Sequence, residues 1–258
     1  MADNWRKKYL FDPKGERPFR LSRSKVDLFR ECPRCFYFDR RLGVSRPSMP
    51  AFSLNNAVDI LMKKEFDIHR AKQAAHPLME TYGIHAVPFD HEDMNRWRDA
   101  LRGGVTYDVP GTNFTITGGL DDIWVDEEGK LIVVDYKATA TDKEISLDDK
   151  WKQNYKRQVE LYQWLLRKND FTVSDTAYFV FCNGTTDREA FDGKLEFDVQ
   201  ILPYEGSDDW VEGTVKKAHA CLMNNKAPES GAECEYCMYR EAWQTAESRV
   251  VGQALDSG

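Results

Sequence analysis

The chain has 258 residues, of which 41% are hydrophobic, and its formal net charge is −7. A chain of this length can bury a core of its own, so we expect one domain of fair size. It begins without an apolar leader and contains no uncharged apolar run of about 18 residues. These absences argue against secretion and membrane insertion and predict a cytoplasmic protein.

The first predicted element is a helical segment at residues 21–39, interrupted by a Cys-Pro-Arg-Cys motif at residues 32–35. Basic residues strongly outnumber acidic ones between Arg17 and Arg46, although the whole chain is acidic. Such a stretch suits the phosphates of a nucleic acid, and a solvated helix face is the ordinary alternative.

Three consecutive rings, Phe36, Tyr37 and Phe38, follow in the same stretch. Rings beside arginines can stack on unpaired bases, so we expect this arm, with Arg40 and Arg41, to contact a single strand. The alternative is that the rings belong to the core.

A long helix is predicted at residues 54–70, because apolar residues recur there at helical spacing. The residues expected to face inward are Ala57, Val58, Leu61, Met62 and Phe66. A further helix is expected from residue 91 to residue 101.

Residues 118–137 predict a β-hairpin on which charges converge. An apolar-rich strand at 120–125 precedes a turn at 126–129 and a β-branched strand at 131–136. Because side chains alternate along a strand, Asp135 and Lys137 share one face, and the turn brings Asp121 roughly opposite Asp135. Two carboxylates and an ammonium can hold a divalent cation and orient a water or neutralise a phosphoryl oxygen. The ordinary alternative is a chance set of charges at strand ends.

The next predicted element is a helix at residues 151–167, which we expect to pack on the sheet through one apolar stripe. The stripe consists of Trp151, Tyr155, Val159, Tyr162 and Leu166. Gln158 lies beside it, one turn before Tyr162, and a buried amide there requires a polar partner. Basic residues on this helix suit a phosphate track: Lys150, Lys152, Lys156 and Arg157. Strands at 176–182 and 195–202 and a helix at 208–223 follow.

Together these motifs resemble the PD-(D/E)xK nuclease superfamily, in its RecB-like branch. The matching elements, in order, are Gly118-x-x-Asp121, Asp135-x-Lys137 and Gln158-x-x-x-Tyr162. The resemblance implies an α/β fold with a restriction-endonuclease-like mixed β-sheet flanked by helices. It implies a nuclease core at about residues 52–205 within a single domain spanning residues 1–258.

The resemblance also implies a deoxyribonuclease that depends on Mg²⁺ or Mn²⁺. Asp121 and Asp135 would bind the metal, and Lys137, Gln158 and Tyr162 would complete the catalytic set. The expected partner is DNA, single-stranded or with ends, in repair, recombination or defence, together with a helicase or a repair complex.

RecB-like nucleases often place a histidine ligand on the helix before the hairpin. Here Asp59 occupies the comparable position, which departs from that pattern but keeps an oxygen ligand. Glu65 and His69 on the same helix are the alternatives.

Four of the six cysteines form two Cys-x-x-Cys pairs, Cys32 with Cys35 and Cys234 with Cys237. In a chain without an export signal they indicate a four-thiolate metal centre rather than disulfides, with a redox pair as the alternative. We expect it to be structural and to join the terminal segments at about 20–45 and 226–245. The resemblance favours a [4Fe–4S] cluster over zinc, although the usual pattern has one cysteine before the core and three after it.

Two other functions fit this sequence. One is a catalytically weak nuclease-fold module that binds DNA or a helicase. The other is a cysteine-based metal or redox protein, which leaves the charged hairpin unexplained.

Overall fold

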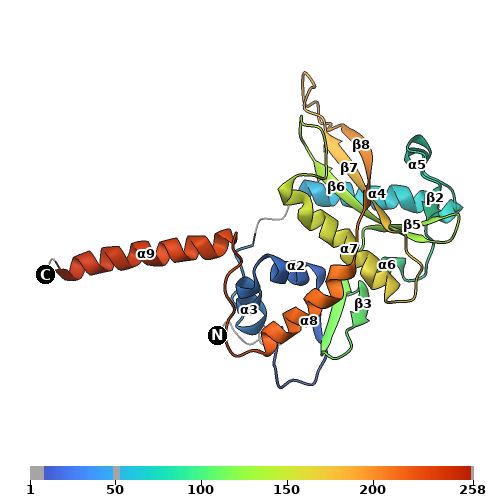
Figure 1. The fold of residues 1–258 in the computed structure, drawn as a ribbon. Helices are drawn as coiled ribbons and strands as arrows, with labels where there is room; N and C mark the ends of the chain where they lie inside the picture. Colours follow the sequence, from blue (N-terminus) through green and yellow to red (C-terminus); the bar gives the residue numbers. More distant parts are fainter. Residues whose placement is uncertain (1–8, 49–52, 257–258) are drawn as a thin grey trace. The chain divides into compact units, whose positions relative to one another are not determined.

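The structure, a computed structural model, describes residues 9–48 and 53–256 (Figure 1). The chain divides into two compact units. The first contains residues up to 49, residues 110–114 and residues from 212 onward, and the second contains residues 50–109 and 115–211. The core predicted at 52–205 therefore falls mainly in the second unit, and the terminal cysteine segments fall in the first.

A five-stranded mixed sheet organises the second unit, with the order β2-β5-β6-β7-β8. Its strands are β2 (Ala86–Pro88), β5 (Asp122–Asp126), β6 (Leu131–Thr139), β7 (Thr176–Gly184) and β8 (Phe197–Glu205). β6 and β7 pair in parallel, whereas the other neighbours pair antiparallel. Because a parallel pair needs a crossover, the chain inserts helix α7 (Gln153–Arg167) between these two strands. The mixed α/β class predicted from the sequence is confirmed.

The remaining elements of this unit surround the sheet. They are α4 (Ser53–Lys72), α5 (Pro77–Thr81), α6 (Met94–Arg98), β3 (Val105–Asp108), β4 (Phe114–Gly118) and the 3-10 turn η1 (Lys150–Lys152). β3 and β4 form an antiparallel hairpin. Phe114, the first residue of β4, belongs to the first unit.

β6 is buried on both faces, which explains its unbroken β-branched run. Val134 and Tyr136 share one hydrophobic cluster with Phe66 of α4. Asp135 lies between these two residues in the sequence, so its side chain points to the opposite face of the strand, where it accepts a hydrogen bond from Gln158 of α7. The second face of β6 therefore carries the charged residues toward α7.

The first unit contains β1 (Phe19–Ser22), α2 (Arg23–Glu31), α3 (Pro33–Arg41), most of α8 (Asp209–Met223) and α9 (Glu235–Asp256), the long red helix of Figure 1. Its aromatic core includes Phe11, whose ring meets Phe19 and Phe114 edge to face at centroid distances of 5.3 and 5.7 Å. Phe36 and Tyr37 are also buried. The expectation that these two rings stack on bases is therefore wrong.

Several predicted elements differ in detail. Residues 19–22 form a strand before α2, and the helix expected at 91–101 is reduced to α6. On α4, Met62 and Phe66 point inward as predicted, but Ala57 and Leu61 are exposed. None of the described helices combines the length and apolar character needed to cross a membrane.

Candidate active site and four-cysteine centre

The β5–β6 hairpin brings Asp121 and Asp135 together. Asp122 pairs with Val134, so Asp121, one residue before β5, falls next to Asp135 and Tyr136. The backbone N–H of Tyr136 donates to Asp121 Oδ2 at 3.1 Å, which fixes this carboxylate at the end of the hairpin.

Asp135 is fully buried, and its two oxygens have different partners. Oδ1 accepts a hydrogen bond of 2.7 Å from Gln158 Nε2. Oδ2 contacts the Lys137 ammonium but accepts no well-aligned hydrogen bond from any described residue. Burial raises the pKa of Asp135 to about 7, with Lys137 opposing the rise and Asp121 adding to it. A buried carboxylate beside a second carboxylate, with one oxygen that accepts no aligned hydrogen bond, suits a divalent cation.

Lys137 lies within this cluster, and its side chain is only 16% exposed. Burial lowers the pKa of Lys137, but Asp135 and Asp121 more than offset that effect and leave the pKa above its ordinary value. Its Nζ also lies 4.5 Å from the centre of the Tyr155 ring. The ammonium therefore remains charged at neutral pH.

Gln158 and Tyr162 support Asp135 from α7. Gln158 Nε2 donates to the Tyr162 hydroxyl at 3.2 Å as well as to Asp135. The Tyr162 ring packs so tightly on β4 that a Cβ at Gly118 would lie 2.7 Å from it. This close approach gives a physical reason for the glycine that begins the Gly118-x-x-Asp121 motif.

Asp59 on α4 does not join the two hairpin carboxylates directly. The Lys63 ammonium lies 2.8 Å from Asp59 Oδ2 and 3.2 Å from Asp121 Oδ1, and so bridges them. The pKa of Asp59 is raised by burial and by Asp121, and that of Lys63 is raised because the two carboxylates outweigh burial. Sequence reasoning missed Lys63, although its four-residue spacing from Asp59 on a helix was a usable signal.

The alternative ligands on α4 have other partners. Glu65 Oε1 bonds His76 Nε2 at 2.9 Å, and His69 Nδ1 lies 3.0 Å from the carbonyl oxygen of Ala75.

Asp122, the neighbour of Asp121, belongs to a separate buried network. Its carboxylate contacts Arg70, accepts a hydrogen bond from Arg98 at 3.1 Å, and accepts another from the Tyr136 hydroxyl at 2.6 Å. Both oxygens therefore have partners within the protein. Asp122 therefore fixes the hairpin and is unsuited to bind a metal.

The basic residues at the start of α7 are partly neutralised. Lys152 is buried and lies 2.9 Å from Asp149, while Lys156 lies 4.0 Å from Asp148. The side chain of Lys150 lies outside the described part of the chain.

The N-terminal arm in the first unit also pairs internally. Lys25 and Arg40 both contact the buried carboxylate of Asp39, and Arg41 donates to the carbonyl of Phe11. These contacts weaken the prediction of a phosphate track along this arm.

A family model described as the PD-(D/E)XK nuclease superfamily matches residues 54–242. The chain belongs to the PD-(D/E)XK nuclease superfamily. The match spans Asp59, the hairpin, and Gln158 with Tyr162, so the residues brought together here lie within it. Members of this superfamily are nucleases, which makes a nuclease-type function and nucleic-acid binding the general expectation for this protein.

A solved structure described as "Crystal structure of SSO0001" is similar to this nuclease-superfamily chain at 17% identity and a TM-score of 0.36. The similarity covers 88% of this chain and 85% of that chain. No curated protein matches.

This superfamily member also carries the predicted cysteine group. The group consists of Cys32, Cys35, Cys234 and Cys237, and their four Sγ atoms all lie within 4.8 Å of one another. The Sγ of Cys35 is 3.6 Å from that of Cys234 and 3.7 Å from that of Cys237, and no disulfide joins any of them.

The Cys-Pro-Arg-Cys motif builds half of this group at the N-terminus of α3. Cys32 is the N-cap, its sulfur accepts from the Cys35 N–H at 3.4 Å, and Pro33 occupies the first turn. The Gly231 N–H donates to the same sulfur at 3.2 Å. Burial raises the pKa of the Cys32 thiol, but these hydrogen bonds bring it down to about 7. The thiolate form of Cys32 is therefore favoured, whereas burial raises the pKa of Cys35 and that of Cys237.

Arg46 is a further neighbour that sequence reasoning missed. Its Nη2 donates to Cys234 Sγ at 3.4 Å, its Nη1 pairs with Glu31 at 2.8 Å, and its guanidinium lies 4.6 Å from the centre of the Tyr236 ring. A guanidinium beside four sulfurs offsets the negative charge that thiolates accumulate around a metal.

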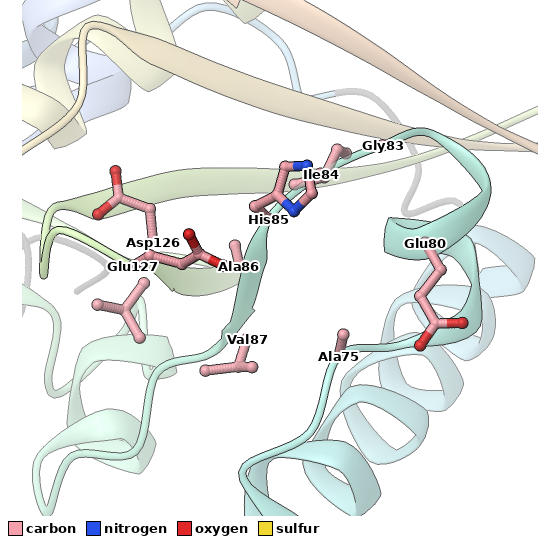
Figure 2. Close-up of a pocket in the computed structure, with 10 residues that line it drawn as sticks. Ala75, Glu80, Gly83, Ile84, His85, Ala86, Val87, Asp126 and Glu127 are labelled. Atoms are coloured by element: carbon pink, nitrogen blue, oxygen red, sulfur yellow. The ribbon is translucent and has the colours of Figure 1, made fainter.

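A hollow of about 460 Å³ on the second unit lies apart from the predicted site residues. Figure 2 shows His85, Asp126 and Glu127 on the strand side of this hollow, with Glu80 across from them. Its wall contains three acidic residues and neither lysine nor arginine. The negative potential disfavours a nucleic-acid backbone there.

Proposed function

We propose that this protein is a metal-dependent deoxyribonuclease that hydrolyses phosphodiester bonds in single strands or at DNA ends. The observation that carries the proposal is the buried Asp135, held by Gln158 on one oxygen and facing Lys137 and Asp121 with the other. Such a cluster on a nuclease-superfamily scaffold supports phosphodiester hydrolysis.

Each residue has a role that follows from its contacts. Asp121 and Asp135 would hold Mg²⁺ or Mn²⁺ through their carboxylate oxygens, and the ion would supply Lewis-acid chemistry that polarises the phosphate and activates water. Gln158 orients Asp135 by its 2.7 Å hydrogen bond. Lys137 presents a positive charge where negative charge develops on the phosphate in the transition state.

Tyr162 and Asp59 act around this set. The Tyr162 hydroxyl accepts from Gln158 and so limits the rotation of that amide. Asp59 can add an oxygen ligand once the Lys63 ammonium has left the space between Asp59 and Asp121.

The four-cysteine group is proposed to be a structural metal centre. Four sulfurs around one Zn²⁺, at Zn–S distances of about 2.3 Å, stand about 3.8 Å apart. Three of the six sulfur pairs here are 3.6, 3.7 and 3.8 Å apart, and all four sulfurs lie within 4.8 Å of one another. In a [4Fe–4S] cluster each cysteine sulfur binds a different iron atom, so the four cysteine sulfurs must lie further apart than they do around a single ion. The spacing therefore supports a single tetrahedral ion, in preference to the cluster that the family resemblance implies.

The decisive experiment is a cleavage assay with labelled single- and double-stranded DNA and RNA of one sequence. Each substrate is incubated with Mg²⁺, Mn²⁺ or a chelator. We expect cleavage of DNA with either metal, greatest on single strands or at ends, and none with the chelator. Asp135→Ala and Lys137→Ala should each reduce the rate by about three orders of magnitude or more.

Glu127→Gln serves as the matched control, because Glu127 is exposed on the turn of the same hairpin. It should cleave at the wild-type rate. Full activity of the folded Asp135→Ala variant, or cleavage of RNA alone, would refute the proposal.

A further inference from the structure

A groove of about 350 Å³ begins at Lys137 and continues along the connection from β6 to α7. Its wall includes Thr139, Thr141, Trp151 and Tyr155. The volume lies in the range of about 300–1,000 Å³ that small-ligand sites occupy. Since Lys137 belongs to the candidate active site, anything bound in this groove lies next to the reacting phosphate.

Trp151 is the unusual residue of this groove. The helical pattern predicts that its ring packs on the sheet, but the chain forms η1 at residues 150–152 before α7 begins. The side chain is consequently 60% exposed. Its ring meets Tyr155 edge to face, with centroids 5.7 Å apart and planes at 81°. An exposed indole braced by a second ring offers a flat apolar face for stacking.

Lys152 holds this indole in place. Its ammonium lies 4.8 Å from the centre of the Trp151 ring, donates to the carbonyl of Ser146 at 2.5 Å and pairs with Asp149 at 2.9 Å. The cation and the loop it anchors restrict the ring at the groove wall. The stacking face is thus organised before any ligand arrives.

The loop at the other side of the groove is fixed to the sheet. Asn183 of β7 accepts from the Thr141 N–H at 2.9 Å and donates to the Thr141 carbonyl at 3.0 Å. The groove wall carries three lysines, Lys137, Lys143 and Lys152, against two acidic residues, Glu144 and Asp149. Lys137 is already paired with Asp135 and Lys152 with Asp149, so little net charge remains on the wall, and the exposed ring favours a ligand with a planar group.

We propose that this groove binds an unpaired nucleobase adjacent to the scissile phosphate, stacked on Trp151. The inference rests on the proposed nuclease function and specifies its substrate as single-stranded. In a duplex both faces of a base are covered by its neighbours, so a base reaches Trp151 only from a single strand or a frayed end. Because stacking reads no sequence, we expect all four bases to bind.

The test measures equilibrium binding with Ca²⁺ in place of Mg²⁺, by anisotropy of a labelled eight-nucleotide thymidine oligomer. The comparison ligand has the same backbone without bases. Wild-type protein should prefer the oligomer with bases, and Trp151→Ala should reduce that preference roughly tenfold. Trp151→Phe should keep most of it. Phe191→Ala, which removes another exposed ring of the same unit, should keep all of it.

Equal preferences in wild type and Trp151→Ala overturn the groove assignment, even if the protein cleaves DNA. Loss of the preference in Trp151→Ala supports it, even if the wild type cuts nothing and the nuclease proposal fails. As a second measurement, 5-iodouracil in the oligomer should crosslink to Trp151 on irradiation. Crosslinks confined to other residues would overturn the proposal.

Discussion

The ammonium of Lys63 lies 3.2 Å from an oxygen of Asp121, the carboxylate at the end of the β5–β6 hairpin. It also pairs with Asp59, so the protein places its own cation between two of the acidic groups proposed to hold a metal. A divalent ion that uses both carboxylates has to displace this ammonium.

We therefore predict that Lys63→Met increases the affinity for divalent metal. Removing a unit charge a few ångströms from the ion should tighten Mn²⁺ binding roughly tenfold. Calorimetry or the electron paramagnetic resonance of free Mn²⁺ measures the change. Lys64→Met, one exposed residue further along α4, is the control and should bind like the wild type. Weaker binding by Lys63→Met would mean that Lys63 supports the ion.

A second prediction concerns Gln158. Gln158→Leu keeps much of the side-chain volume but removes the donor to buried Asp135 Oδ1. Cleavage should fall by about 10- to 100-fold, because the carboxylate loses its fixed orientation. Stability should fall by about 1–3 kcal/mol, since a buried acceptor is left unpaired. Rates and denaturant unfolding give the two values. Tyr162→Phe should have a smaller effect than Gln158→Leu on both the cleavage rate and the stability. An equal or larger effect of Tyr162→Phe would contradict the prediction that Gln158 is the more important of the two residues.

A third prediction concerns the four-cysteine centre. Protein purified without oxygen should be colourless and contain one zinc per chain, as elemental analysis can show. Cys32→Ser or Cys237→Ser should lose the metal and lower Tm by roughly 5–10 °C. Cys221→Ser, outside the group, should retain it. A brown protein containing iron and acid-labile sulfide would instead establish the cluster implied by the family resemblance.

A fourth prediction uses Asp39, whose side chain is 1% exposed. Burial raises its pKa, but hydrogen bonds from Arg40, Lys25 and Ser45 more than offset this and leave the pKa below its ordinary value. The stabilisation is thus present above the unfolded pKa of about 3.9 and is lost as pH falls through the lower folded pKa.

Asp39→Asn should therefore lower the free energy of unfolding by about 2 kcal/mol at pH 7. The difference between variant and wild type should shrink as the pH falls below about 4. Denaturant unfolding at several pH values measures it. Glu16→Gln, at an exposed position of the same unit, is the control. A deficit that stays constant across this pH range would contradict the role given to the Asp39 charge.

The sequence pattern was sufficient where short-range geometry decides the outcome. A four-residue turn and period-two alternation place Asp121 beside Asp135, and one helical turn places Gln158 beside Tyr162. The pattern failed where the burial or the contacts of a residue depend on segments that are distant in the sequence. Leu61 fits an apolar helix stripe, yet the residue is 62% exposed, whereas its neighbour Met62 is buried against the sheet.

Trp151 and Lys63 show two further causes of failure. A 3-10 turn before α7 rotates Trp151 out of the stripe, and a three-residue irregularity of this kind leaves little trace in a periodic pattern. Lys63 pairs with Asp59 on its own helix, but its contact with Asp121 joins residues 58 positions apart. Charge pairs at such separations depend on the tertiary fold. Local pattern cannot supply them.

The two halves of the four-cysteine group leave the ribosome at very different times. Cys35 is synthesised early, whereas Cys234 and Cys237 follow only after the whole five-stranded sheet has been translated. The second unit can thus fold while the first still lacks its last two sulfurs. Any chain interrupted before residue 234 keeps an incomplete pair of thiols. Closure of this group consequently requires that translation has passed Cys237, by which point every strand of the sheet has been synthesised.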